Sequence, residues 1–188
     1  MSHIIETERL RLVPVNPRHI AAFFRSRAEL ASMLGAAVPD DWPVCPEGMG
    51  YWRERAEELE KAPGWAGYFF MHKADDKVVG DGGFKGPPNA EGAVEMGYAL
   101  IPDYRRRGLA TEAARALMDW AFTHPEVNSV TAETLADGRE SMRLLDGLGM
   151  TFQEARTDRG EVEVYLWAIS REEYNTPRKP PETQGCPF

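Results

Sequence analysis

The residues with the clearest chemical potential form a basic loop, Arg105-Arg106-Arg107-Gly108-Leu109-Ala110. It stands at the start of a helix-like pattern, and the first amides of a helix have no intrahelical acceptor. The helix dipole adds partial positive charge at the same end, and glycine lets the backbone approach a ligand closely. The loop therefore predicts a cradle for a phosphate or another small anion.

The flanking elements place this loop at a strand-to-helix turn. Residues 94–101 are apolar and strand-like, and Pro102 ends them because proline lacks the N–H that a sheet ladder needs. Apolar residues then recur at helical spacing over 109–121, until Pro125 forbids further helix. The order of strand, basic loop and helix is one that presents helix amides to an anion.

Two common phosphate motifs are absent: there is no Gly-x-x-x-x-Gly-Lys-Ser/Thr and no Gly-x-Gly-x-x-Gly after a strand. The pattern that is present is Arg-x-x-Gly-x-Ala, with Arg105, Gly108 and Ala110 at its fixed positions. It resembles the acyl-coenzyme-A-binding signature Gln/Arg-x-x-Gly-x-Gly/Ala of the GNAT superfamily of N-acetyltransferases.

Three further segments resemble the same superfamily, in the expected order along residues 5–169. Residues 7–12 resemble the opening strand of its ribosomal-protein, or RimJ/RimL-type, subgroup. Residues 95–98 with 108–113 resemble that subgroup's central block, and 141–150 its late helix. The resemblance implies transfer of an acetyl group from acetyl-CoA to a primary amine, by direct attack in a ternary complex.

The resemblance also implies where coenzyme A binds. In the resembled family the sheet opens between the strand before the phosphate loop and the next strand, here 131–135, and the pantetheine arm pairs with the exposed backbone. The residues so assigned to the cofactor are Tyr98, Ala99, Leu100, Ile101, Arg105, Arg106, Arg107, Gly108, Leu109, Ala110, Thr111, Gly138 and Ser141.

Glu95 is the predicted general base, because many family members carry a glutamate at this position of the strand. The two-residue period places Glu95 and Gly97 on one face and Met96 and Tyr98 on the other. Partial burial would raise the pKa of the carboxyl toward the working range of a base. The alternative is a strand glutamate that only forms an ion pair with an arginine.

The general acid is harder to assign, because two family positions differ in this chain. Leu145 stands where many members carry a tyrosine, and leucine cannot donate a proton. Ser141 matches the serine of the subgroup's Asn-x-x-Ser motif, whereas Gly138 replaces the asparagine. Ser141 is therefore either the catalytic donor to the sulfur or a helix cap.

The composition disfavours several partners. The net charge of −8 argues against nucleic acid and mildly favours a cationic acceptor. No apolar run reaches the roughly 18 residues of a membrane span, and Met1-Ser2-His3 does not open a secretory signal. Cys45 and Cys186 lack the spacing of a metal site or of a disulfide framework. We therefore expect a cytoplasmic protein without a metal or a membrane partner.

Alternating strand and helix patterns predict one α/β (α+β) domain over residues 1–170. As in the resembled family, the sheet should be mixed, mostly antiparallel and splayed at its centre, with helices on both faces. The Pro-rich segment 171–188 is expected to be a flexible tail. The expected strands are 4–13, 68–72, 78–83, 94–101, 129–135, 152–156 and 162–169, and the expected helices are 18–34, 51–61, 109–121 and 139–148.

Two other functions stay open at this level. A module of the same fold could sense acyl-CoA without turnover, since the usual tyrosine and asparagine are missing, or an unrelated protein could bind nucleotide phosphates with the arginine loop. The acceptor is not specified: a protein N-terminus, a polyamine and an aminoglycoside all fit, and a homodimer is left open. The loops expected to select the acceptor are 36–50, 82–91 and 158–162.

Overall fold

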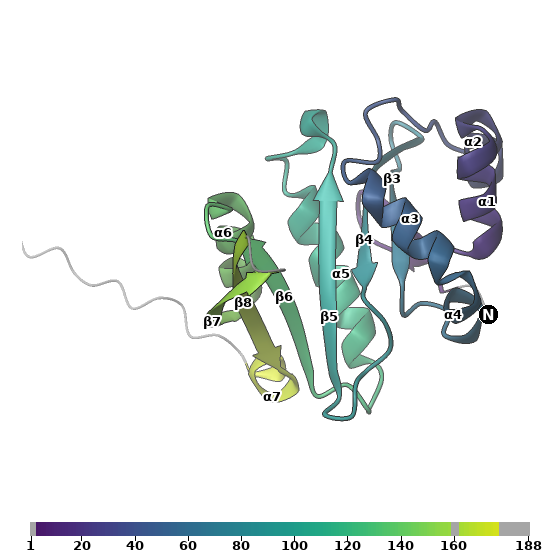
Figure 1. The fold of residues 1–188 in the computed structure, drawn as a ribbon. Helices are drawn as coiled ribbons and strands as arrows, with labels where there is room; N and C mark the ends of the chain where they lie inside the picture. The colour runs from purple at the N-terminus through teal and green to yellow at the C-terminus, as the bar shows by residue number, and fades with distance from the viewer. Residues whose placement is uncertain (1–2, 159–161, 177–188) are drawn as a thin grey trace, which may run out of the picture.

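The computed structural model describes residues 3–158 and 162–176. Within them, eight strands form one sheet in the order β1-β2-β3-β4-β5-β6-β8-β7 (Figure 1). The strands are β1 (Ile5–Glu6), β2 (Leu10–Pro14), β3 (Gly67–His72), β4 (Lys77–Phe84), β5 (Ala93–Leu100), β6 (Ser129–Leu135), β7 (Thr151–Asp158) and β8 (Val162–Ser170). The helices are α1 (Pro17–Arg25), α2 (Arg27–Leu34), α3 (Pro46–Glu54), α4 (Ala56–Lys61), α5 (Leu109–Phe122), α6 (Arg139–Leu148), α7 (Arg171–Asn175) and the 3₁₀ helix η1 (Pro102–Tyr104).

The sheet opens at its centre, between β5 and β6. These two strands are parallel, whereas the other neighbours are antiparallel. Their pairing runs from Ala93 with Ser129 to Met96 with Ala132 and stops there, although β5 continues to Leu100. The predicted mixed, mostly antiparallel and centrally splayed sheet is therefore confirmed.

Aromatic side chains attach helices to both faces of the sheet. On one face, the ring of Phe84 lies 5.6 Å from that of Trp120 on α5. On the other face, the ring centre of Phe69 lies 5.4 Å from that of His19 on α1 and 6.4 Å from that of Trp52 on α3. Figure 1 shows α5 behind β5 and α3 in front of the sheet. Helices on both faces were predicted, and the prediction is confirmed.

Three elements expected to be continuous are interrupted. The expected helix 51–61 is divided at Arg55, which ends α3 before α4 begins, and the other two are interrupted by local hydrogen bonds. The expected strand 4–13 turns at Thr7, whose N–H donates to the Leu10 carbonyl and whose hydroxyl oxygen accepts from the Leu10 amide. The expected helix 18–34 breaks at Ser26, which ends α1 with its own N–H and caps α2 with its side chain. Apolar periodicity did not distinguish one long helix from two short ones.

The ordered domain continues beyond the boundary predicted at residue 170. Ser170 caps the short helix α7 through a capping box. The Arg171 side chain donates hydrogen bonds to the carbonyls of Phe122 and Val127, at 2.7 and 2.9 Å. These contacts fix α7 against the end of α5. The rest of the predicted tail, 177–188, lies outside the described residues.

Candidate active site

The basic loop leads directly into α5, a helix of 14 residues. Gly108 is its N-cap, at a φ of 77°, and no side chain caps the helix. The first backbone bond into the helix runs from the Glu112 amide to the Gly108 carbonyl, at 3.0 Å. The amides of 109–111 are thus left for an external acceptor. The buried Leu109 side chain belongs to the core, so this residue offers a ligand only its backbone.

The three arginines of the loop are held differently. The Arg105 side chain turns back, and its Nε donates to the Leu100 carbonyl at 2.8 Å. The Arg107 guanidinium lies 5.1 Å from the ring centre of Tyr104. Arg106 is exposed and has a positive φ of 56°. The protein itself therefore holds the guanidinium groups of Arg105 and Arg107, whereas the Arg106 side chain is exposed.

Backbone groups of β5 point alternately toward β4 and toward the gap that separates it from β6. The Lys85 amide donates to the Glu95 carbonyl, and the Ile101 amide donates to the Val79 carbonyl, both at 2.9 Å. Odd-numbered residues therefore pair with β4. In an antiparallel ladder, the residues between them direct their backbone groups the other way.

This alternation divides the four residues of 98–101 that were predicted to contact the pantetheine arm. Tyr98 and Leu100 direct backbone groups into the gap, whereas Ala99 and Ile101 direct theirs toward β4. The Leu100 carbonyl already accepts the Arg105 side chain. Backbone groups alternate in direction along a strand as side chains do. Four consecutive residues, as predicted, therefore cannot all direct their backbone groups into the gap.

Glu95 lies where β5 and β6 begin to separate, and its side chain is 29% exposed. Its carboxylate contacts the Lys85 ammonium, which also lies 3.6 Å from Glu133 Oε2 on β6. Burial acts to lower the pKa of Lys85, but its contacts with Glu95 and Glu133 outweigh burial and raise it. Glu95 thus forms an ion pair with a lysine, and not with the arginine that the alternative named; its role as a base stays a prediction.

Two hydroxyl groups, those of Tyr98 and Ser141, lie on the face of the sheet opposite to the Glu95 side chain. The Tyr98 hydroxyl is buried without a hydrogen-bond partner among the described residues. Burial raises the pKa of Tyr98 to about 12, and the nearby Ser141 hydroxyl acts to lower it. The two hydroxyl groups do not meet the geometry of a hydrogen bond. The alternative role of Ser141 as a helix cap is wrong: the N-cap of α6 is Gly138, and no side chain caps it. Leu145 is fully buried.

Sequence reasoning missed Asp81, a buried carboxyl on β4. Asp81 is paired with Ala99 of β5, and its Oδ1 accepts a hydrogen bond from the Trp42 indole at 2.9 Å. Burial raises the pKa of Asp81 to about 6, although the Trp42 bond acts in the other direction. An aspartate inside a strand of otherwise apolar and glycine residues was the available signal.

Asp81→Asn is expected to stabilise the protein at neutral pH. A pKa raised in the folded state means that stability is lost as pH rises from about 4 to about 6 and stays lower above that range. The amide keeps an acceptor for Trp42 but carries no charge, so unfolding at pH 7.5 should cost up to about 3 kcal/mol more. Urea titrations at pH 4.5, 5.5 and 7.5 measure this, with the exposed Asp137→Asn as control. A constant difference across pH contradicts it.

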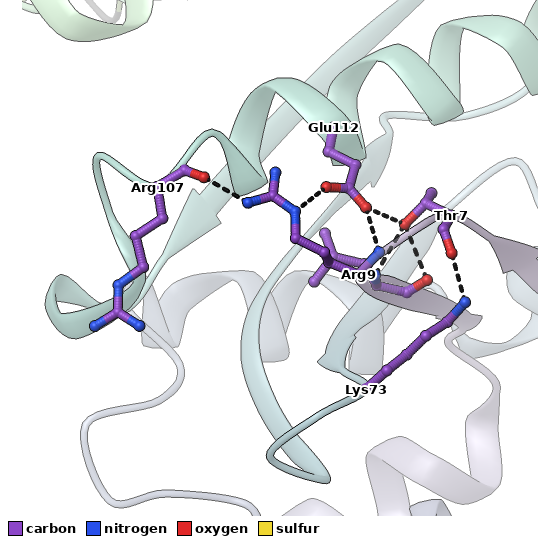
Figure 2. Close-up of polar contacts among 6 residues, drawn as sticks. Thr7, Arg9, Lys73, Arg107 and Glu112 are labelled. Carbon is purple, nitrogen blue, oxygen red and sulfur yellow. Dashed lines mark hydrogen bonds and ion pairs between the residues drawn. The ribbon is translucent and has the colours of Figure 1, made fainter.

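The N-terminal Thr-Glu-Arg segment is bound to the loop and to α5 (Figure 2). The Thr7 hydroxyl and the Arg9 amide donate to Glu112 Oε1 at 2.6 and 2.7 Å, and Arg9 Nε donates to Oε2 at 2.7 Å. Arg9 Nη1 also donates to the Arg107 carbonyl at 2.7 Å. Burial acts to raise the pKa of Glu112, but these bonds outweigh it and lower the pKa. Arg9 therefore holds the loop in place.

The described part of the chain offers neither a metal site nor a membrane span. No group of three or more His, Cys, Asp or Glu side chains is arranged there to hold a metal ion. No helix in those ranges is long and apolar enough to cross a bilayer. The groups that these residues do bring to the site are the hydroxyl, carboxyl, ammonium, guanidinium and backbone amide groups described above.

Comparison with known proteins places these features in a family. A family model described as an acetyltransferase (GNAT) domain matches residues 9–151. An uncharacterized N-acetyltransferase of Bacillus subtilis, YjdG, is 30% identical over 148 residues, covering 78% of this chain and 88% of the relative. The region matched by the family model contains the whole of the basic loop and both strands of the splay.

Solved structures share the fold at low identity. A RimL ribosomal L7/L12 alpha-N-protein acetyltransferase in complex with coenzyme A is 16% identical, with a TM-score of 0.64, and the match covers 89% of this chain and 98% of that one. A ribosomal-protein-S5-alanine acetyltransferase from Vibrio fischeri is 16% identical, with a TM-score of 0.65, covering 92% and 99%. The fold described here is therefore that of known acetyltransferases.

Proposed function

The chain belongs to the GNAT acetyltransferase family, and from this premise we propose that it transfers the acetyl group of acetyl-CoA to a primary amine by direct attack in a ternary complex. The observation that carries the proposal is the open N-terminus of α5, which adjoins the gap between β5 and β6. A helix end suits the pyrophosphate, and a splayed sheet offers backbone groups to an amide-containing arm.

Positioning is the first task of this site. The amides of 109–111 and the arginines of the loop bind negative charge at one end of the gap. Tyr98 and Leu100 supply backbone groups along its β5 edge. Holding the thioester and the amine side by side removes the entropic cost of bringing them together, which is a large part of the barrier in such reactions.

Proton removal is the second task, and we assign it to Glu95. An acceptor amine arrives protonated, and it must lose a proton before its lone pair can attack the thioester carbonyl. The Lys85 ammonium contacts the same carboxylate. An incoming ammonium group competes with Lys85 for Glu95, which accepts one proton from it and so frees the lone pair that forms the carbon–nitrogen bond.

The third task is to stabilise the sulfur that leaves. Glu95 and Tyr98 lie on opposite faces of β5, because their side chains alternate along the strand. The hydroxyls of Ser141 and Tyr98 therefore approach the gap from the side opposite the base. We assign the donor role to Ser141, whose hydroxyl donates a hydrogen bond to the sulfur as the carbon–sulfur bond breaks. The leaving thiolate then takes up the second proton that the attacking nitrogen loses.

Ser141→Ala is expected to lower turnover about tenfold at saturating substrates, because the sulfur loses a donor. Its stability should change by no more than about 0.5 kcal/mol, since Ser141 does not cap α6. Steady-state kinetics and urea unfolding measure the two effects. The companion variant Tyr98→Phe separates the hydroxyls: a loss of turnover in that protein alone would transfer the role to Tyr98.

The experiment that tests the proposed function is a screen of purified protein with acetyl-CoA against an amine panel, reading thiol release and the mass of the acetylated product. We expect thiol release that depends on one amine class. Tight acetyl-CoA binding with no acetylated product from any amine would instead favour the sensor. Displacement of coenzyme A by simple adenine nucleotides at similar affinity would favour the nucleotide-phosphate binder, an alternative that the family assignment already disfavours.

A further inference from the structure

One face of β5 is open over the residues that follow Glu95. Met96 is paired with Phe84 on the α5 side of the sheet, so Glu95, Gly97 and Ala99 share the face opposite to α5. Gly97 is exposed, and a Cβ added to it would meet no atom within 4 Å. No helix of the described ranges covers this face of β5 in Figure 1. A ligand that reaches Glu95 can therefore lie along the strand toward Ala99.

A second carboxylate lies on the same face, beside Ala99. Asp81 of β4 is the partner of Ala99, and paired residues of an antiparallel ladder direct their side chains to one face. Ala99 follows Glu95 by four positions, which is roughly 13 Å along a strand. The face thus presents a carboxylate at each end of an open stretch, with only the small residues Gly97 and Ala99 between them.

The Asp81 carboxylate has no positively charged partner in the described part of the chain. Its Oδ1 accepts the hydrogen bond from Trp42, whereas Oδ2 accepts none and is not one of the enclosed polar atoms there. No basic side chain of those residues acts on the pKa of Asp81, which burial raises. A desolvated charge without a counter-charge destabilises a folded protein. A cationic group of a ligand would supply the missing counter-charge.

The other end of the stretch also keeps negative charge after its ion pairs are counted. Glu95 and Glu133 share a single ammonium group, that of Lys85. When an acceptor ammonium replaces Lys85 at Glu95, Lys85 keeps Glu133 as its partner. Each end of the stretch therefore has one carboxylate for one positive charge of a ligand.

From this placement we infer that Asp81 selects the acceptor, and that the acceptor is a linear diamine or polyamine. Its reacting amine meets Glu95, and a second, charged amine binds Asp81. A chain of about eight carbons between two amines spans about 11 Å at about 1.2 Å per bond, which suits the interval along β5. The inference rests on the proposed function, because it assigns the reacting amine to Glu95. Asp81 directly precedes 82–91, one of the loops expected to select the acceptor.

Acetylation kinetics of the full chain at saturating acetyl-CoA test the assignment with 1,8-diaminooctane and 8-aminooctan-1-ol, which differ in the second amine. We expect kcat/KM for the diamine to exceed that for the amino alcohol at least about tenfold, beyond the factor of two from its equivalent ends. In Asp81→Asn this preference should fall to about threefold or less, because the amide keeps the Trp42 bond but has no charge. Asp41→Asn, an exposed position beside Trp42, is the matched control and should keep the preference.

A purely structural role of Asp81 has a different signature, since a displaced Trp42 would lower kcat/KM for both amines equally and leave the preference unchanged. Gly97→Leu is the second variant. It fills the open stretch and should raise KM for the diamine at least about fivefold, with coenzyme A affinity within about twofold. Gly147→Leu on α6 is its control, because a Cβ there also meets no atom within 4 Å.

Three results would overturn the assignment and leave amine acetylation standing. They are equal kcat/KM for the two amines, a preference that survives in Asp81→Asn, and an unchanged KM in Gly97→Leu. Acetylation of other amines but of neither probe would have the same meaning. If no amine at all is acetylated, the proposed function fails, and the assignment fails with it.

Discussion

Glu95→Gln is expected to lower turnover by about a hundredfold or more, while acetyl-CoA affinity stays within about twofold. The amide has nearly the same shape as the carboxylate but cannot accept the proton that the acceptor ammonium must lose. It also cannot pair with Lys85 as an ion. Kinetics at saturating acceptor together with calorimetry for acetyl-CoA separate loss of chemistry from loss of binding.

Glu133→Gln is the matched control for this experiment. Glu133 contacts the same Lys85 ammonium, and its side chain is 28% exposed, against 29% for Glu95. If the only role of Glu95 were to hold Lys85, the two variants would lose activity to a similar extent. We expect Glu133→Gln to keep at least about a third of the turnover. Equal losses in both proteins would remove Glu95 from the role of base.

Gly108→Val is expected to weaken coenzyme A binding at least about tenfold. The backbone at Gly108 has a φ of 77°, which a β-branched residue adopts only at a cost of about 1–3 kcal/mol. A Cβ there would meet only the Arg9 guanidinium, at 3.4 Å, so the cost is conformational and not a clash with the core. The strained loop would move the α5 amides away from the pyrophosphate, and calorimetry measures the affinity that remains.

Gly35→Val controls for strain itself. Gly35 also has a left-handed backbone, with a φ of 63°, and a Cβ added there would meet no atom within 4 Å, but this glycine ends α2 instead of opening α5. Both variants should lose similar stability in urea unfolding, and only Gly108→Val should lose coenzyme A affinity. If affinity falls equally in the two proteins, or in neither, the loop does not hold the coenzyme.

Elements whose ends are marked by proline or glycine could be predicted from the sequence. Pro102 and Gly108 delimit the basic loop within seven residues, and β6 and α6 have the predicted bounds. Interruptions such as that at Ser26 were not predicted, because a serine in a helical pattern either caps a new helix or points to solvent. Propensity over a short window does not decide between these outcomes.

Contacts set by strand register could not be predicted. Lys85 reaches Glu95, and Asp81 lies beside Ala99, only because β4 and β5 pair in one particular register. A shift of one residue would place each side chain on the other face. The Trp42 bond to Asp81 spans 39 positions in the chain. Motif resemblance identified the loop, whereas the ion pair and the buried acid required the assembled sheet.

The contact between Arg9 and the Arg107 carbonyl has a thermodynamic consequence. It joins the N-terminal turn to the basic loop that we propose binds coenzyme A, so each segment is held in part by the other. Coupling between two sites is reciprocal. The free energy that the Arg9 contacts add to ligand binding equals the free energy by which the bound ligand stabilises the N-terminal strands against unfolding. If coenzyme A binds the basic loop as we propose, its binding and the detachment of the hairpin formed by β1 and β2 oppose each other.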